Sequence, residues 1–225
     1  MAQIYAALTG DIVKSSKLSS EKLDEVREAI EQASGEVGEW ERGLVAAKPD
    51  FFRGDSWQMV LAEPAYALRV AMYLRASLKA RNKTWDSRIA IGIGRVEPLE
   101  KKQASLSSGP AMMASGKALD KMGAKYRLAI ATEDGDTVEA RWVELAIRLV
   151  DILVGHWTRG QAEAVKAALW PREQTHEEIA RRMYPDADDE QIKDAKRRSV
   201  TKSLDGADWH GLEEALERFE SADWP

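Results

Sequence analysis

The order of predicted strands and helices constrains the fold of this chain more than any other feature. Five apolar or alternating segments predict strands, over residues 3–9, 43–52, 56–62, 87–96 and 126–132. Helical spacing of apolar residues fills the longer gaps, from Leu23 to Val37, from Pro64 to Leu78 and from Pro110 to Met122. Arg53-Gly54-Asp55 joins the second and third strands as a hairpin. The first four strands and the first two helices follow the order βαββαβ, with a third helix and a fifth strand after them. This order predicts an α+β fold of the ferredoxin-like type, with helices on one face of the sheet.

The second part of the chain is predicted to be helical. Asp134-Gly135-Asp136 breaks the chain before a long amphipathic helix over residues 137–157. Its apolar stripe is wide, and wide stripes usually face the core of the same molecule. We therefore expect this helix to be buried within one molecule, with Trp142 in the core. Packing on a second copy of the protein is the alternative. Four further helices are expected over residues 159–169, 175–184, 188–204 and 208–220. The predicted organisation is a domain over 1–135, a connecting helix over 136–157 and a small all-α domain over 158–225.

Composition limits the chemistry and the surroundings of the protein. No cysteine occurs among the 225 residues, which excludes disulfides, thiolate metal sites and cysteine nucleophiles. The amino terminus has no basic segment, and charged residues interrupt the apolar pattern of 137–157. We therefore expect no signal peptide, no membrane partner and a cytoplasmic location. Because the net charge of −5 does not attract DNA, any DNA binding would have to come from a local basic patch.

Two aspartates are predicted to lie at neighbouring strand ends. Asp11 closes the first strand, and Asp55 lies at the tip of the hairpin that should pair beside it. Such a pair suits Mg²⁺ or Mn²⁺, because Mg²⁺ commonly takes one or two carboxylates together with substrate phosphates. Backbone N–H groups, two hydroxyls and two ammonium groups follow in residues 12–17 and suit a phosphate. The alternative is that both Gly-Asp pairs are only turns.

Four segments occur in an order that resembles a known family. They run from Leu8 to Leu18, from Phe52 to Gln58, from Arg88 to Gly94 and from Ser108 to Ser115. Together they resemble the SatD family of bacterial proteins and, more distantly, the class III nucleotidyl cyclase catalytic domain, which is related to polymerase palm domains. The resemblance implies a metal site at Asp11, Asp55 and Ile12, and a phosphate-binding turn at Val13, Lys14, Ser15 and Ser16.

The sequence departs from the cyclase pattern at three positions. Cyclases read the base with a lysine where this chain has Phe51, and they steady the transition state with an asparagine and an arginine where it has Met113 and Lys117. Methionine donates no hydrogen bond, and the lysine ammonium is a point charge, whereas the arginine guanidinium is planar and can donate two parallel hydrogen bonds. The expected site therefore binds metal and phosphate, with Lys117 as a further phosphate-binding residue, but lacks the groups for base selection and cyclase turnover.

The helices after Thr158 carry a second resemblance. Residues 158–165 and 175–183 resemble the sigma-factor region 4 type of helix-turn-helix, and Thr175 with Glu178 predicts a capping box. In the next helix, a basic side is expected to point away from Ile192, Ala195 and Ser199, as a recognition helix requires. The predicted DNA-binding residues are Lys193, Arg197, Arg198, Thr201 and Lys202. Acidic neighbours leave a protein-interaction helix bundle as the alternative.

These features combine into one functional hypothesis with two alternatives. The leading hypothesis is a regulatory protein that binds a nucleotide or phosphorylated small molecule with a divalent cation, and DNA through its second domain. Ligand occupancy would then alter how the 137–157 helix presents the DNA-binding part. The first alternative is a divergent nucleotidyl cyclase or nucleotidyltransferase enzyme, and the second is a protein-interaction adaptor. The sequence leaves both enzymatic activity and a homodimer open.

Overall fold

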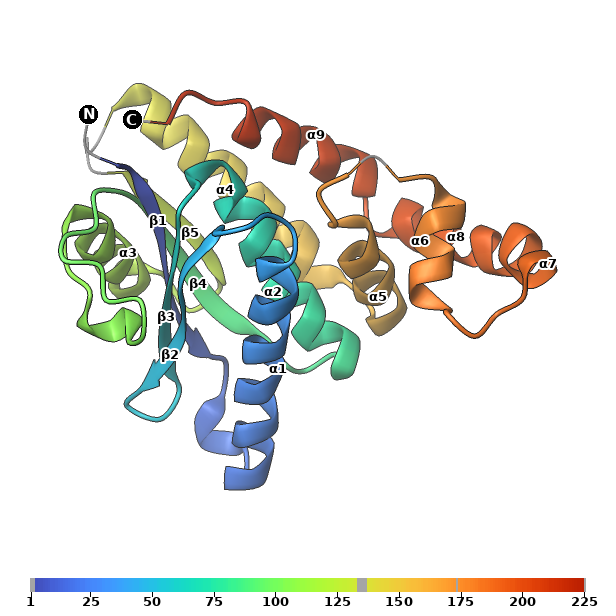
Figure 1. The fold of residues 1–225 in the computed structure, drawn as a ribbon, viewed down its shortest axis with the longest axis horizontal. Coiled ribbons are helices and arrows are strands. Elements are labelled where there is room, and N and C mark those ends of the chain that lie inside the picture. Colours follow the sequence, from blue (N-terminus) through green and yellow to red (C-terminus); the bar gives the residue numbers. More distant parts are fainter. Residues whose placement is uncertain (1–2, 133–136, 173, 225) are drawn as a thin grey trace.

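One mixed β-sheet forms the centre of the protein (Figure 1). The computed structural model describes residues 3–132, 137–172 and 174–224, and it has an α+β architecture. The five strands are β1 (Tyr5–Ile12), β2 (Val45–Phe52), β3 (Ser56–Leu61), β4 (Ser87–Gly94) and β5 (Leu128–Thr132), in the spatial order β2-β3-β1-β4-β5. Only β4 and β5 pair in parallel among these neighbours. Arg53 and Gly54 make the β2–β3 hairpin with positive φ angles of 50° and 88°, so glycine suits the second position.

Helices cover both faces of the sheet. The helices α1 (Ser20–Gly38), α2 (Ala67–Arg81) and α4 (Val138–His156) lie on one face, whereas α3 (Pro110–Lys121) lies on the other (Figure 1). The expectation of helices on one face is therefore wrong for α3. Gly92 permits its position, because a Cβ there would lie 2.1 Å from the carbonyl oxygen of Ala111. The main core fills the space between the sheet and α1, α2 and α4.

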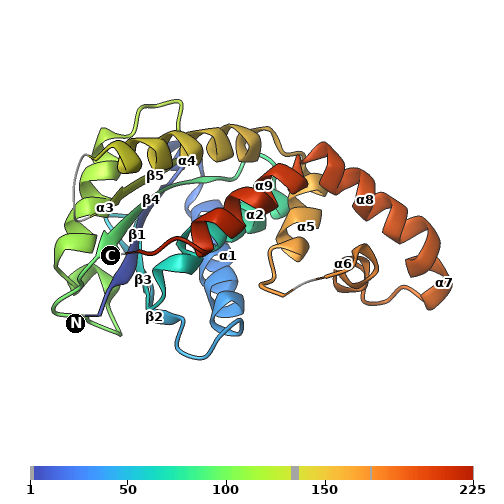
Figure 2. The same cartoon turned by 90° about the horizontal axis from the view of Figure 1, so that it is seen from above.

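The C-terminal helices extend the same core. They are α5 (Arg159–Ala168), α6 (His176–Met183), α7 (Asp189–Gln191), α8 (Arg197–Gly206) and α9 (Trp209–Glu220), with a π-helical turn, η4 (Ile192–Lys196), before α8. α5 packs on α2, and α9 runs back alongside α2 and α4 (Figure 2). Arg69 of α2 pairs with Glu220 of α9 at 2.5 Å. One cluster of buried residues continues from the sheet to Phe219, across the expected boundary after residue 157.

Two expectations about helix faces are wrong. One side of α4 is buried through Ile147, Val150 and Val154, but the other leaves Trp142 67 % exposed, because α4 lies at the β5 edge with nothing described beyond it. In α8 the packed residues are Val200 and Leu204, while Ser199 is exposed. The π-helical turn explains this shift, since one added residue rotates the following helix by roughly a quarter turn. Among the described residues, no helix has the length and apolar content to span a membrane.

Candidate functional site

The sheet register brings the two predicted aspartates together. Asp11 pairs with Ser56 across β1 and β3, which places it beside Asp55 at the same end of the sheet. The N–H of Ile12 donates to the carbonyl oxygen of Asp55 at 3.1 Å. The hydroxyl of Ser15 donates to the Asp55 carboxylate. The structure therefore brings Asp55 next to Asp11, Ile12 and Ser15, which lie forty or more residues before it in the sequence.

Arg88 is a member of this site that the sequence analysis did not assign. It lies on β4 directly across from Asp11, and its guanidinium donates to both carboxylate oxygens, with Nε 2.8 Å from Oδ1. The hydrogen bond to Asp11 raises the pKa of Arg88; partial burial opposes the rise, and the charges of Asp11 and Asp55 reinforce it. A charged residue at the start of an otherwise apolar strand was the available signal. Arg88 neutralises Asp11 from within the protein.

The predicted divalent-cation site has two carboxylates, those of Asp11 and Asp55. Mg²⁺ and Mn²⁺ prefer hard oxygen ligands, and Mg²⁺ is commonly held by one or two carboxylates plus phosphate oxygens. Within the described ranges, no group of three or more histidine, aspartate or glutamate side chains is placed to hold a metal. Asp11 and Asp55 are the carboxylates that could hold such a cation, and the ion pair between Asp11 and Arg88 would have to break first. The cation would supply positive charge to a bound phosphate.

The predicted phosphate-binding turn has free donors at three of its positions. Lys14 has a left-handed backbone with φ 57°, and a single 3₁₀ turn, η1 (Ser15–Lys17), follows it. The N–H of Val13 already donates to the Asp86 carbonyl at 3.0 Å. In the part of the chain that the structure describes, no carbonyl accepts from the N–H groups of Lys14, Ser15 and Ser16. Successive backbone N–H groups in a turn that contains a left-handed residue can form an anion-binding site.

A small cavity adjoins this turn. It has a volume of about 150 Å³, and its walls combine the ammonium-bearing Lys14 and Lys17 with Leu18 and Trp85. Ile12 also lines it, whereas the Asp11 side chain points to the opposite face of β1 because side chains alternate along a strand. Lys117 is exposed on α3, and no hydrogen bond or ion pair among the described residues joins it to either aspartate. The structure therefore does not bring Lys117 into contact with the pair.

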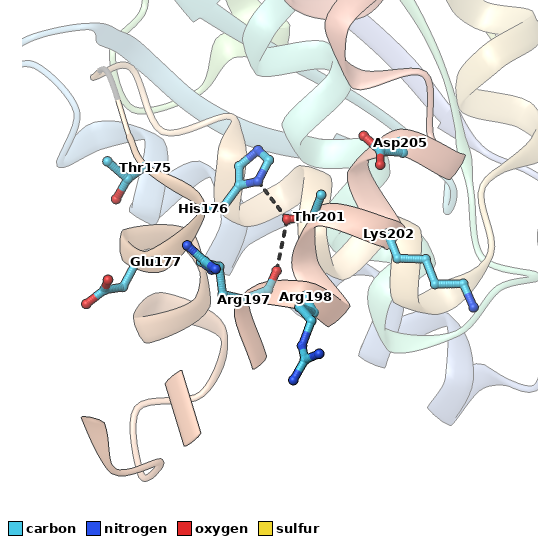
Figure 3. Close-up of a pocket in the computed structure, with 8 residues that line it drawn as sticks. All are labelled: Thr175, His176, Glu177, Arg197, Arg198, Thr201, Lys202 and Asp205. Carbon is cyan, nitrogen blue, oxygen red and sulfur yellow. Dashed lines mark hydrogen bonds between the residues drawn. The ribbon is translucent and has the colours of Figure 1, made fainter. Parts of the chain in front are cut away.

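A larger groove lies between α6 and α8. Its volume is about 690 Å³, and Figure 3 shows the side chains that line it. The lining residues are Thr175, His176, Glu177, Arg197, Arg198, Thr201, Lys202 and Asp205. Four of the five predicted DNA-binding residues are among them; Lys193 lies on the π-helical turn instead. The sequence analysis missed His176, whose Nδ1 lies 2.8 Å from the Thr201 hydroxyl and fastens α6 to α8.

The positively charged side chains of this groove differ in whether they are ion-paired within the protein. Arg198 pairs with Asp194 of the π-helical turn that precedes α8. No ion pair involves Arg197, Lys202 or Lys193 in the described structure. Thr175 and Glu178 form the predicted capping box at the amino terminus of α6, and Thr175, His176 and Glu177 at this end of the helix line the groove. The groove therefore presents two free cations and a helix amino terminus to solvent.

A buried charge network joins the phosphate-binding turn to α4. Arg75 of α2 is wholly buried; it contacts both oxygens of Asp86 at 2.8 and 2.9 Å and Asp151 of α4 at 2.6 Å. Lys79 adds a contact of 3.4 Å to Asp86. Burial raises the pKa of Asp86, but the charges of Arg75 and Lys79 outweigh burial and hold that pKa below its usual value. Since Asp86 also accepts the Val13 N–H, the network reaches the turn itself.

No family model matches the chain, and no curated protein matches it.

Proposed function

We propose that this chain is a regulatory protein that binds DNA through a helix-turn-helix made by α6 and α8. In the same proposal, the Asp11–Asp55 end of the sheet binds a nucleotide or other phosphorylated ligand with Mg²⁺ or Mn²⁺. The observation that carries the proposal is the groove of about 690 Å³, where Arg197 and Lys202 project without ion pairs in the described structure. Phosphates of nucleic acids are recognised by such cations and by helix amino termini.

Helix α8 has the features of a recognition helix. It is ten residues long, and its exposed side carries Arg197, Arg198 and Lys202 while Val200 and Leu204 pack inward. A helix of this width enters the major groove of B-DNA, which is about 12 Å wide. The hydrogen bond between His176 and Thr201 fixes α8 relative to α6. Acidic residues of α7, such as Asp189, restrict the approach of DNA to the basic side.

The ligand half of the proposal is supported by strand order. The first four strands pair as β4-β1-β3-β2, all antiparallel, which is the order of a ferredoxin-like βαββαβ unit. This order favours the likeness to cyclase and palm domains and to the SatD family. The likeness accounts for Asp11 at the end of β1 and for Asp55 in the hairpin next to it. The free N–H groups of residues 14–16 suit the phosphate of the ligand.

Salt-dependent binding of duplex DNA tests the first half. Binding of a labelled duplex of mixed sequence is measured by fluorescence anisotropy over a series of KCl concentrations. We expect the double variant Arg197→Glu/Lys202→Glu to bind more weakly and to lose about two units of the slope of log K against log salt, because each phosphate contact contributes about 0.9.

The matched control makes the same charge change elsewhere. Lys101→Glu/Lys102→Glu alters two exposed lysines in the loop before α3 and should leave the slope unchanged. Absence of binding by the wild type at low salt, or equal weakening by both double variants, contradicts the DNA half.

Thermal unfolding with Mn²⁺ and nucleoside triphosphates tests the second half. The wild type should be stabilised, by about 2.7 kcal/mol at a ligand concentration of 100 Kd. Asp55→Asn should abolish the effect, while Asp24→Asn, an exposed carboxyl of α1, should keep it. Equal stabilisation of Asp55→Asn and the wild type contradicts this half. Pyrophosphate release by the wild type and not by Asp55→Asn would favour the nucleotidyltransferase alternative.

A further inference from the structure

Five large apolar side chains lie exposed along one side of α4. They are Val138, Trp142, Leu145, Leu149 and Ile152, with exposed fractions of 64, 67, 45, 56 and 49 %. Elsewhere in the described residues, only Leu106 and Met113 are large hydrophobic side chains of comparable exposure. The five form one continuous stripe rather than scattered exceptions, and scattered single residues are what a monomer normally shows.

The spacing of the stripe is that of a helix–helix seam. Its members are separated by four, three, four and three residues, a repeat of 3.5. That repeat keeps a stripe facing a neighbouring helix along its length and places Trp142 and Leu149 at a positions and the other three at d positions. From Val138 to Ile152 the stripe is about 21 Å long. The surface therefore matches a long partner helix.

Nothing described in the chain itself covers this stripe. The opposite side of α4 packs on β5, α2 and α9 through Ile147, Val150 and Val154. Figure 2 shows α4 along the outer edge of the molecule, beyond β5. All residues except 1–2, 133–136, 173 and 225 are described, so another described segment as occupant is excluded.

The charges beside the stripe argue against a lipid surface. Glu139, Arg141, Glu144 and Arg148 flank it with two charges of each sign, and Arg148 pairs with Glu144. Helices that lie on anionic membranes carry a polar face rich in lysine and arginine. A balanced flank neither attracts such a membrane nor repels an identical helix.

We infer that the occupant is the α4 helix of a second copy, so that α4 forms a homodimer interface. A two-fold axis lets the same stripe meet itself, as in most homodimers. The exposed stripe amounts to roughly 500 Å² on each copy, near the upper end of the largest patch found on monomers. Two such stripes with their polar flanks reach roughly 1,200 Å², where specific interfaces begin. The inference needs neither the proposed ligand nor DNA.

The mass of the full chain in solution tests this interface. By sedimentation equilibrium at tens of micromolar, the wild type should have twice the mass of one chain. Leu145→Glu/Leu149→Glu should be monomeric, with a dissociation constant raised at least about 100-fold, because glutamate in the seam is both desolvated and repelled by its copy. Both side chains are exposed in the single chain, so circular dichroism should report unchanged folding.

A matched substitution and a crosslink separate this surface from others. Leu106→Glu, at the exposed apolar position outside α4, should leave the dimer intact. The chain has no cysteine, so Leu145→Cys introduces a single thiol at the middle of the stripe, where the two copies meet in a parallel or an antiparallel pair. Oxidation should give a covalent dimer, and oxidation of Leu106→Cys should not.

Three results would overturn the inference. One is a wild type that stays monomeric at 100 μM. Another is dissociation by Leu106→Glu to the same extent as by the α4 double variant. The third is a monomer that floats with anionic phospholipid vesicles and loses this binding on Leu145→Glu/Leu149→Glu, which would assign the stripe to a membrane surface.

Discussion

Two arginines show how differently the sheet part and the C-terminal helices use charge. Arg75 is wholly buried in α2 and contacts Asp86 and Asp151, two aspartates from different elements. Arg197 is exposed on α8 and has no ion pair within the described residues. Removing one member of a buried pair leaves an uncompensated charge, whereas an exposed charge is solvated by water. The sheet part therefore uses its charges to hold elements together, and α8 leaves them available to a partner.

Arg88 lies between these extremes. It is ion-paired to Asp11, like Arg75, but its side chain is 31 % exposed. An ion pair open to solvent is worth little in stability and can be exchanged for another partner. Under the proposed function, Arg88 would be the internal cation that a divalent metal replaces at Asp11 when ligand binds.

The largest predicted effect concerns Arg75. Arg75→Met keeps most of the side-chain volume but removes the cation shared by Asp86 and Asp151. Asp86 keeps Lys79 at 3.4 Å, and Asp151 keeps only the backbone N–H of Arg127 at 2.7 Å among the described contacts. We expect the free energy of unfolding to fall by about 3–5 kcal/mol. Urea denaturation followed by circular dichroism measures the change.

The same substitution at Arg197 is the matched control. Arg197→Met removes an exposed charge and should change the free energy of unfolding by no more than about 0.5 kcal/mol. If Arg75→Met and Arg197→Met cost the same, the contrast between structural and available charges is wrong.

The next effect is a gain of cation affinity at Arg88. Arg88→Gln removes the positive charge that occupies Asp11 and leaves the Asp11 carboxylate available to a metal. Mn²⁺ affinity, measured by isothermal titration calorimetry, should rise about tenfold, or 1.4 kcal/mol. Arg27→Gln is the control, because Arg27 contacts the backbone carbonyl of Gly54 in the same hairpin without touching either carboxylate. Unchanged or weaker Mn²⁺ binding by Arg88→Gln would show that Arg88 does not compete with a metal.

Much of the fold was predictable because it depends on local signals. Strand and helix order follows from apolar periodicity, and the hairpin follows from Gly54. The proximity of Asp11 and Asp55 followed from topology, since both are at strand ends that pair. The capping box of Thr175 and Glu178 is a contact within four residues and needs no tertiary information.

The features that the sequence did not predict depend on tertiary contacts between residues far apart in the chain. The pairing of Asp11 with Arg88 requires the β1–β4 register, which joins positions far apart in sequence. Arg75 follows the apolar spacing of α2, so its burial was predictable, but its partners, Asp86 just before β4 and Asp151 on α4, were not. Periodicity showed that α4 has a wide apolar stripe without showing which side the sheet covers, and Trp142 was misplaced for that reason.

The smallest predicted effect lies where the two parts of the molecule meet. Glu36 of α1 accepts a hydrogen bond from the Tyr73 hydroxyl of α2 at 2.6 Å and pairs with Lys166 of α5 at 2.8 Å. Burial raises the pKa of Glu36, but Lys166 and Tyr73 outweigh burial and hold that pKa below its ordinary value of 4.5. The stabilisation by Glu36 is therefore complete above about pH 4.5 and is lost as the pH falls through the lower pKa of the folded protein.

Glu36→Gln should accordingly lose less stability than the wild type on acidification from pH 6 to pH 3. The difference should stay below about 1 kcal/mol, because solvent screens a half-exposed pair. Thermal unfolding at each pH measures it, and Glu31→Gln, an exposed position of α1, should follow the wild-type curve. Identical acid sensitivity of Glu36→Gln and the wild type would mean that apolar packing alone holds this junction. The charges that join α1 to α5 would then contribute little to stability, like the exposed charges of α8 and unlike the buried charges around Arg75.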